Sequence, residues 1–271
     1  MNKRIWGSLD DYLPPLQGST MVGRGFANYN FIKAFFEYSS FDEYHFFLNN
    51  RSHKEEFLTH HEAMLTRMGM ADRIKLFYRT DLAQAMACHD YTVFHQSDPV
   101  THIPPLCRYR NLHGNFPVIA FIHSISYPDI LLKLQDLCWG APHAGDAIIC
   151  SSTCGREVIQ NYLAQIQRER NLEVPPLKLE VLPFGLDVRA LAGHDKVSSR
   201  RELGLPPDET VALCLGRFSE FDKMDLFPLL QAFQQIRPSN QAWRLVLAGA
   251  VNQADYLNML RLWIKAMVYR Y

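Results

Sequence analysis

The chain has 271 residues, with 28 Lys and Arg against 28 Asp and Glu, so its formal net charge is zero. This balance argues against a dedicated nucleic-acid binder, which needs a basic excess to neutralise phosphates. Hydrophobic residues make up 48% of the chain, which favours a packed core over disorder. No stretch approaches the ~20 apolar residues that span a bilayer, and Asp10 and Asp11 interrupt the N-terminal segment too early for a signal peptide. We therefore expect a cytoplasmic protein.

Short apolar runs alternate with helical patterns along the whole chain. The runs predict strands over residues 3–6, 44–48, 73–77, 91–95, 117–122, 147–150, 177–182, 210–215 and 244–248. The clearest helical periodicity covers residues 153–167, 226–236 and 256–267. Strands that alternate with helices predict βα units on a parallel sheet, and so an α/β fold.

A turn-rich, polar stretch between residues 183 and 200 indicates a domain boundary. We divide the chain into a first α/β domain over residues 1–190 and a second over residues 191–271. The second holds two predicted strands, and about 80 residues are few for a doubly wound domain. We therefore expect an incomplete second domain, in which the helix at 256–267 exposes an apolar face that favours self-association.

The strongest local signal is LCLGRFSEFDKMDLFPLLQAF. A predicted strand delivers Gly216 and Arg217 to its carboxyl end, Lys223 follows six residues later, and a helix opens near Asp225. Ligands bind outside the carboxyl ends of strands in open α/β sheets, and a guanidinium, an ammonium and a helix N-terminus can together bind a diphosphate. The alternative is that both cations are solvated surface charges.

The long connection after the first strand is a second candidate site. Gly18 and Ser19 open a glycine-bearing loop ahead of a helix that starts near Phe26. Backbone N–H groups of such a loop can approach an anionic ligand closely. The loop does not match G-x-G-x-x-G, so a dinucleotide fingerprint is not met, and an ordinary βα connection is the alternative.

Histidines at strand ends form a third candidate site. His123 follows the buried-type strand that ends at Ile122, while His95 and Asp98 lie at the end of the preceding strand. Parallel strands place their carboxyl ends at one edge of a sheet, so these side chains can face a common substrate. A structural histidine is the competing interpretation for each.

Metal chemistry has little support in the sequence. The six cysteines are scattered without a C-x-x-C pair, and zinc binding by Cys150 and Cys154 is a weak alternative, because Cys150 ends an apolar run. No spaced carboxylate cluster, Walker lysine loop or G-x-S-x-G motif is present. We expect neither a metal ion nor another cofactor.

Three ordered segments resemble a known family. VLPFGLD, LGRFSEFDKMDLFPLLQAF and WRLVLAG are similar to the "VIPNGVD", "GRLxxxKG" and "LVIAG" segments of retaining GT-B glycosyltransferases of family 4. The resemblance implies two Rossmann-like domains. It also implies transfer of a hexose, with retention, from a nucleotide-diphosphate sugar to a glycan or lipid-linked acceptor. Family members with such acceptors also suggest peripheral membrane contact, for which the stretch FIKAFFEY is a candidate, although core packing is the commoner use of such a stretch.

Roles carried over from the family fall on matching positions. Arg217 and Lys223, with Gly216, would bind the donor diphosphate, and the loop at Gly18 and Ser19 would approach the donor phosphates or the acceptor. His123 would lie near the transferred sugar as the catalytic histidine. His95 and Asp98 are candidate acceptor-side residues.

The chain also departs from the family pattern. The lysine stands one position later than usual, Met224 replaces a glycine, and the first loop has Gly-Ser in place of Gly-Gly. The family's E-x7-E segment, which grips the donor ribose, would lie beyond Tyr271, so we interpret the chain as C-terminally truncated. An inactive remnant that acts as a binding module is therefore the main alternative, and an unrelated nucleotide-binding α/β protein is a third.

Overall fold

In the computed structural model, the described residues are 2–13, 23–97, 105, 108, 114–125, 127, 129–140, 143–171, 177–221, 223–236, 243–251 and 253–268. By their contacts they form two compact units. Unit 1 comprises the described residues up to Leu186, and unit 2 those from Asp187 onward.

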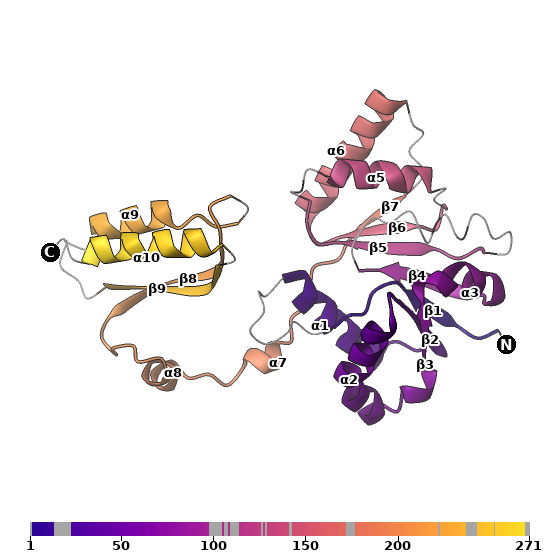
Figure 1. Cartoon of the computed structure of the whole chain (residues 1–271), viewed down its shortest axis with the longest axis horizontal. Helices are drawn as coiled ribbons and strands as arrows, with labels where there is room; N and C mark the ends of the chain where they lie inside the picture. The colour runs from indigo at the N-terminus through magenta and orange to yellow at the C-terminus, as the bar shows by residue number, and fades with distance from the viewer. Residues whose placement is uncertain are drawn as a thin grey trace. The chain divides into compact units, whose positions relative to one another are not determined.

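Unit 1 is built on a parallel sheet of seven strands from the described residues (Figure 1). The strands are β1 (Ile5–Ser8), β2 (Glu43–Leu48), β3 (Ile74–Tyr78), β4 (Tyr91–Gln96), β5 (Val118–Ile122), β6 (Ala147–Cys150) and β7 (Lys178–Val181). Their order is β3-β2-β1-β4-β5-β6-β7, and every neighbouring pair is parallel. After β3 the chain crosses to β4 on the other side of β1, so the switch point, where doubly wound sheets place ligands, lies between β1 and β4.

The helices of unit 1 cover both faces of this sheet. They are α1 (Gly23–Tyr38), α2 (Arg51–Arg67), α3 (Leu82–Cys88), α5 (Ile130–Trp139) and α6 (Thr153–Arg170), with 3-10 turns at Ala71–Arg73 and Arg79–Asp81. The side chains of Asn50 and Ser152 accept N–H groups at the first turns of α2 and α6. Such caps satisfy donors that have no partner within the helix.

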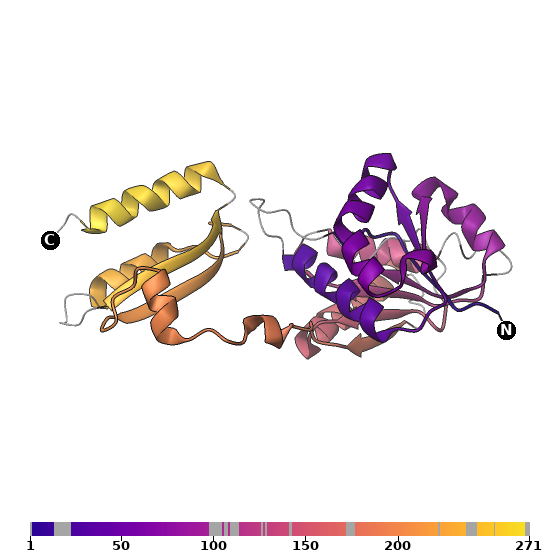
Figure 2. The same cartoon turned by 90° about the horizontal axis from the view of Figure 1, so that it is seen from below.

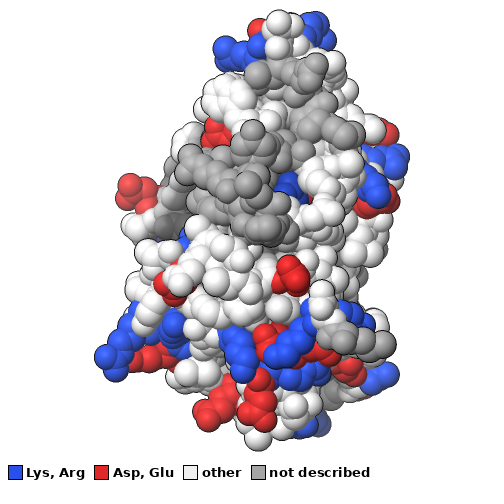
Figure 3. Space-filling model, turned by 90° about the vertical axis from the view of Figure 1, so that its right-hand side faces the viewer, with Lys and Arg blue, Asp and Glu red and all other residues white. Residues whose placement is uncertain are grey.

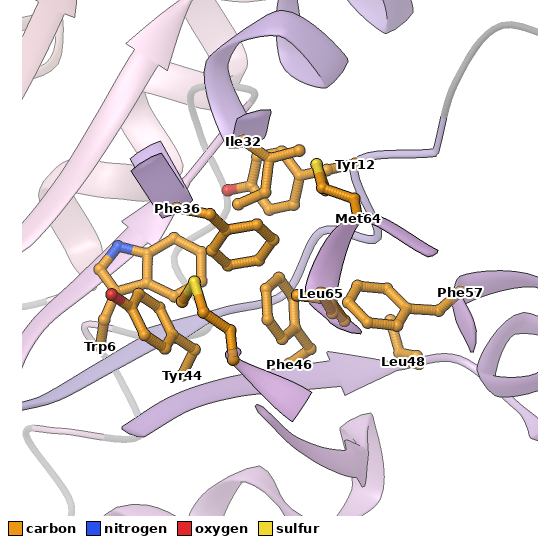
Figure 4. Packing of buried hydrophobic residues seen from close by; sticks show 11 residues of the cluster. Trp6, Tyr12, Ile32, Phe36, Tyr44, Phe46, Leu48, Phe57, Met64 and Leu65 are labelled. Carbon is orange, nitrogen blue, oxygen red and sulfur yellow. The ribbon is translucent and has the colours of Figure 1, made fainter. Parts of the chain in front are cut away.

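The core under α1 and α2 explains why β2 is a strand. Tyr44, Phe46 and Leu48 alternate along β2 and pack with Trp6 and residues of both helices (Figure 4). The intervening Phe47 joins a second cluster with α3 on the opposite face. Successive strand residues point to opposite faces, so a continuous apolar run indicates a strand buried on both sides.

The apolar stretch at residues 31–38 contributes mainly to this core. Ile32 is 0% exposed and Phe36 4%, and Phe31 and Phe35 pack against the same cluster. Tyr38, at the end of α1, is 78% exposed. Core packing, rather than a membrane interface, therefore accounts for most of this stretch.

Unit 2 contains α7 (Val188–Leu191), α8 (Lys196–Glu202), β8 (Thr210–Phe218), α9 (Phe227–Ile236), β9 (Trp243–Val251) and α10 (Ala254–Val268). The two strands pair in parallel over their full length, and they run side by side in Figures 1 and 2. Residues of α9 and α10 pack on one face of this sheet with Phe218, Leu245 and Leu247.

The apolar face expected to be exposed on the last helix is covered at its N-terminal end and exposed farther along. Tyr256 and Leu260 are 3% exposed and pack against Leu230 of α9. Farther along α10, Leu262 is 66% exposed, and on β8 Leu213 is 60% and Leu215 70% exposed. Ile264 of α10 is 37% exposed. One side of α10 is covered by α9 and the sheet. Apolar side chains remain exposed on the rest of α10 and on β8.

All nine predicted strands are present, with ends that differ by a few residues, and the helices at 153–167, 226–236 and 256–267 are confirmed as α6, α9 and α10. The expected α/β fold class is therefore confirmed. Within the part of the chain that the structure describes, no helix combines the length and the hydropathy needed to cross a bilayer. On the face seen in Figure 3, basic and acidic side chains lie intermixed near the bottom of the view.

Candidate functional site

The carboxyl ends of β1, β4 and β5 bring the polar residues of unit 1 to one edge of the sheet. The register pairs Ser8 with His95, and Gln96 with Ala120, so the chain leaves neighbouring strands at nearly the same level. Ser8, Gln96 and Ser97 are all buried. Because these buried polar side chains gather where the strands end, this edge of the sheet is a candidate site.

His95 lies within the wall of this edge. Its side chain is buried, its Nδ1 lies 2.7 Å from the hydroxyl of Tyr12, and its ring stacks on Phe31 with centroids 4.8 Å apart. The Tyr12 hydroxyl also lies 2.9 Å from Oγ of Ser8. Burial lowers the pKa of His95 to about 3, which keeps the ring neutral. This placement fits a structural role, since the imidazole supports the segment after β1.

That segment is held in a conformation that few residues adopt. Tyr12 has φ 51°, in the left-handed region that is uncommon for a bulky residue. The backbone N–H of Ser97 donates to Oδ2 of Asp10 over 2.6 Å, and Asn28 of α1 donates to Oγ of Ser97 over 2.9 Å. Burial raises the pKa of Asp10. These contacts connect the segment to β4 and α1. Sequence reasoning missed both Asp10 and Tyr12.

His123 follows β5 and lies in a group of three rings. Its ring stacks on Phe184 at a centroid distance of 5.0 Å and an interplanar angle of 12°. Phe121 lies 5.3 Å from His123 and 5.1 Å from Phe184. His123 is also close enough to His95 for its charge to depress the pKa of His95 further. His95 near the end of β4 and His123 after β5 thus lie at the same edge of the sheet, while Gly18, Ser19 and Asp98 lie outside the described residues.

In unit 2 the two strands are in close contact at a pair of glycines. Gly216 pairs with Gly249, and a Cβ added to Gly249 would lie 1.6 Å from the carbonyl oxygen of Gly216. Gly249 also has φ 156°, which side chains rarely tolerate. Gly216 is followed directly by Arg217, so this close contact fixes the backbone that carries the arginine.

The loop after β8 folds back onto the strand end. Met224 forms a parallel bridge with Phe218, and the N–H of Ser219 donates to the carbonyl of Met224 over 3.1 Å. Lys223, next to Met224, is exposed. Among the described residues, neither Arg217 nor Lys223 has an ion-pair partner.

The N-terminus of α9 is already capped by the protein. Oδ1 of Asp225 accepts the N–H of Phe227 over 3.1 Å and the hydroxyl of Tyr256 over 2.9 Å. The same hydroxyl accepts the N–H of Leu226 over 2.7 Å. These two N–H groups, expected to help bind a diphosphate, are therefore occupied. Among the described residues between Gly216 and Asp225, the cationic side chains are those of Arg217 and Lys223.

The described side chains offer no metal centre. Within the described ranges, no group of three or more His, Cys, Asp or Glu side chains is arranged to hold a metal ion. Cys150 is buried and Cys154 exposed, and both are free thiols.

Comparison with known proteins gives one fold and one short sequence match. No protein-family model matches the chain. The fold is similar to that of Anabaena HepE in its crystal structure with UDP, with a TM-score of 0.62 and 15% identity over 98% of this chain. The HepE structures with UDP and glucose and with UDP-glucose give TM-scores of 0.59 and 0.57 at 14% identity over 99% of this chain. The GT-B-type fold expected from the sequence is consistent with this likeness.

The short match is to D-inositol 3-phosphate glycosyltransferase of Segniliparus rotundus, at 34% identity over 74 residues. These are 27% of this chain and 16% of that protein. The chain spans 66 to 67% of the length of the HepE chains.

Proposed function

We propose that the chain belongs to a glycosyltransferase that moves a hexose from a nucleoside-diphosphate sugar to a glycan or lipid-linked acceptor, with retention and without a metal ion. The observation that carries the proposal is the pair of cationic side chains at the end of β8. There Arg217 lies in the parallel strand β8, just before its end at Phe218, and Lys223 lies in the loop that follows. Neither has an ion-pair partner among the described residues. The solved complexes of HepE with UDP and UDP-glucose, and the matched glycosyltransferase, support the donor class.

The proposed chemistry makes use of both cations. The bond between the anomeric carbon and the diphosphate oxygen breaks, and the acceptor hydroxyl oxygen bonds to that carbon while its proton leaves with the diphosphate. Negative charge builds up on the leaving group during this step. Arg217 can hold two phosphate oxygens through its planar guanidinium, and Lys223 adds a mobile charge. In many enzymes, groups fixed in advance around developing charge contribute more to the rate than any other feature of the site.

His123 has a separate role in this proposal. Its imidazole follows β5 at the edge of the unit 1 sheet and would hydrogen-bond a hydroxyl of the transferred sugar. His95, neutral and bonded to Tyr12, would support the wall behind it. Placement of the sugar matters because a well-oriented bound geometry removes much of the entropic barrier.

The test is release of UDP from UDP-glucose by the full chain in the presence of a panel of hydroxyl acceptors. Arg217→Ala and Lys223→Ala should each lower the rate by about 100-fold, because each removes one contact to the developing charge. Arg261→Ala is the matched control, since Arg261 is an exposed cation on α10 of the same unit. Unchanged rates in both site variants would overturn the diphosphate assignment.

A binding module is the competing function. In this alternative, the chain binds the donor without turning it over. Calorimetric titration with UDP separates the two. Binding that depends on Arg217 without UDP release would support the module, whereas binding together with release supports the transferase.

A further inference from the structure

Phe184 lies in an extended segment that follows β7. The N–H of Leu182 still donates to the carbonyl of Cys150 over 2.9 Å, and beyond it the chain has no regular structure as far as Asp187. Leu182 is 56% exposed and Leu186 67%, whereas Phe184 is 42% exposed. Phe184 is therefore exposed as well, but less so than its two apolar neighbours.

The Phe184 ring contacts His123 and Phe121. The Phe184 ring is nearly parallel to both, at 12° to His123 and 24° to Phe121, with centroids 5.0 and 5.1 Å away. His123 and Phe121 are themselves 5.3 Å apart. The Phe184 ring therefore contacts both the His123 ring and the Phe121 ring. Offset-stacked rings at these distances attract each other.

This stack constrains the imidazole. The ring torsion of histidine is intrinsically broad, so the side chain alone does not fix the direction of the two ring nitrogens. A stacked neighbour such as Phe184 limits tilting of the His123 ring away from the plane parallel to the Phe184 ring. A leucine at position 184 would keep apolar contact but would supply no flat surface.

We propose that Phe184 is a positioning residue that holds the His123 imidazole in the plane from which its nitrogens reach the sugar. The contact with sugar rests on the proposed function, whereas the control of the ring orientation does not. Phe184 itself touches no reacting atom in this proposal.

The ring orientation is tested by NMR of the His123 ring protons in the full chain, assigned with His123→Gln. Phe184→Leu should move these resonances downfield, because a stacked aromatic ring shifts them upfield, and should broaden the distribution of ring orientations. Phe184→Tyr should leave them close to their original positions. Tyr38→Leu, which removes an exposed ring from α1 of the same unit, should change nothing. Resonances that stay unchanged in Phe184→Leu would overturn the proposal.

Kinetics separate this role from general stability. Phe184→Leu should lower kcat by about 10- to 100-fold, with an unchanged KM for the donor, as small displacements of a reacting group do. Phe184→Tyr should restore kcat. If UDP release is absent even in the unmodified chain, the proposed function fails while the NMR comparison still decides the positioning. If Phe184→Leu unfolds, Phe184→Tyr and Phe184→Asn give the same comparison, and equal resonances in those two would contradict the inference.

Discussion

Gly249 meets Gly216 so closely that a Cβ on Gly249 would lie 1.6 Å from the Gly216 carbonyl oxygen. Replacing Gly249 by alanine must push β9 away from β8, and φ 156° adds backbone strain. We expect Gly249→Ala to destabilise unit 2 by about 2–5 kcal/mol. Urea unfolding measures this. Gly216→Ala is the matched control, since its Cβ would meet only the flexible Met224 side chain, with Cε at 3.4 Å. Equal stability of the two variants would contradict the close contact.

Asp146 and Arg108 form a buried, two-pronged ion pair in unit 1. Nη1 and Nη2 of Arg108 donate to the two carboxylate oxygens over 2.6 and 2.7 Å. The N–H groups of Val118 and His143 donate to the same carboxylate. Asp146→Ala leaves a buried charge and two backbone donors without their acceptor, so we expect a loss of about 3–5 kcal/mol. Chemical denaturation would show it. The exposed Glu169→Ala should stay within about 0.5 kcal/mol of the unmodified chain.

The strands were predictable because their signals are local: short apolar runs mark β1 to β9. The diphosphate role inferred from the order of Gly216, Arg217 and Lys223 stays a prediction. The Arg108–Asp146 pair was not predictable. Arg108 and Asp146 are 38 residues apart, and no local sequence pattern around either residue indicates the other as its partner.

Sequence reasoning also missed the residues that support the candidate site. Phe184 resembles any apolar residue of a turn until the fold places it over His123. Tyr12 gives no local sign of its left-handed backbone, which is maintained by contacts with Ser8 and His95. The uncovered face of β8 was missed for a related reason. A helical pattern shows which face is apolar, but it does not show which neighbour covers that face.

Three buried histidines make the stability of unit 1 depend on pH. Burial lowers the pKa of His45, His61 and His95. The folded state therefore binds fewer protons than the unfolded chain below about pH 6.5, and stability falls as pH drops from there. Asp10, whose pKa is raised by burial, acts in the opposite direction.

The prediction concerns how steeply the free energy of unfolding changes with pH. The unfolding free energy should fall between about pH 6.5 and 5, and His95→Gln should lower the slope by about 1.4 kcal/mol per pH unit, the amount for one proton. Denaturation at several pH values gives the slope. The exposed His194→Gln should leave it unchanged. A slope that is the same in His95→Gln would show that the His95 ring is not kept neutral by folding.

Tyr256 joins α10 to the loop that carries the proposed diphosphate site. Its hydroxyl accepts the N–H of Leu226 over 2.7 Å and donates to Asp225 over 2.9 Å. Tyr256→Phe keeps the apolar packing but leaves the buried N–H of Leu226 without an acceptor, which should cost about 1–3 kcal/mol. The loop should also lose its fixed position, so that UDP binds about tenfold more weakly. Calorimetry and urea unfolding measure the two effects, and Tyr38→Phe, at an exposed site, serves as the control. Weaker UDP binding without loss of stability would place Tyr256 in contact with the nucleotide, whereas loss of stability with unchanged binding would separate this hydrogen bond from the site.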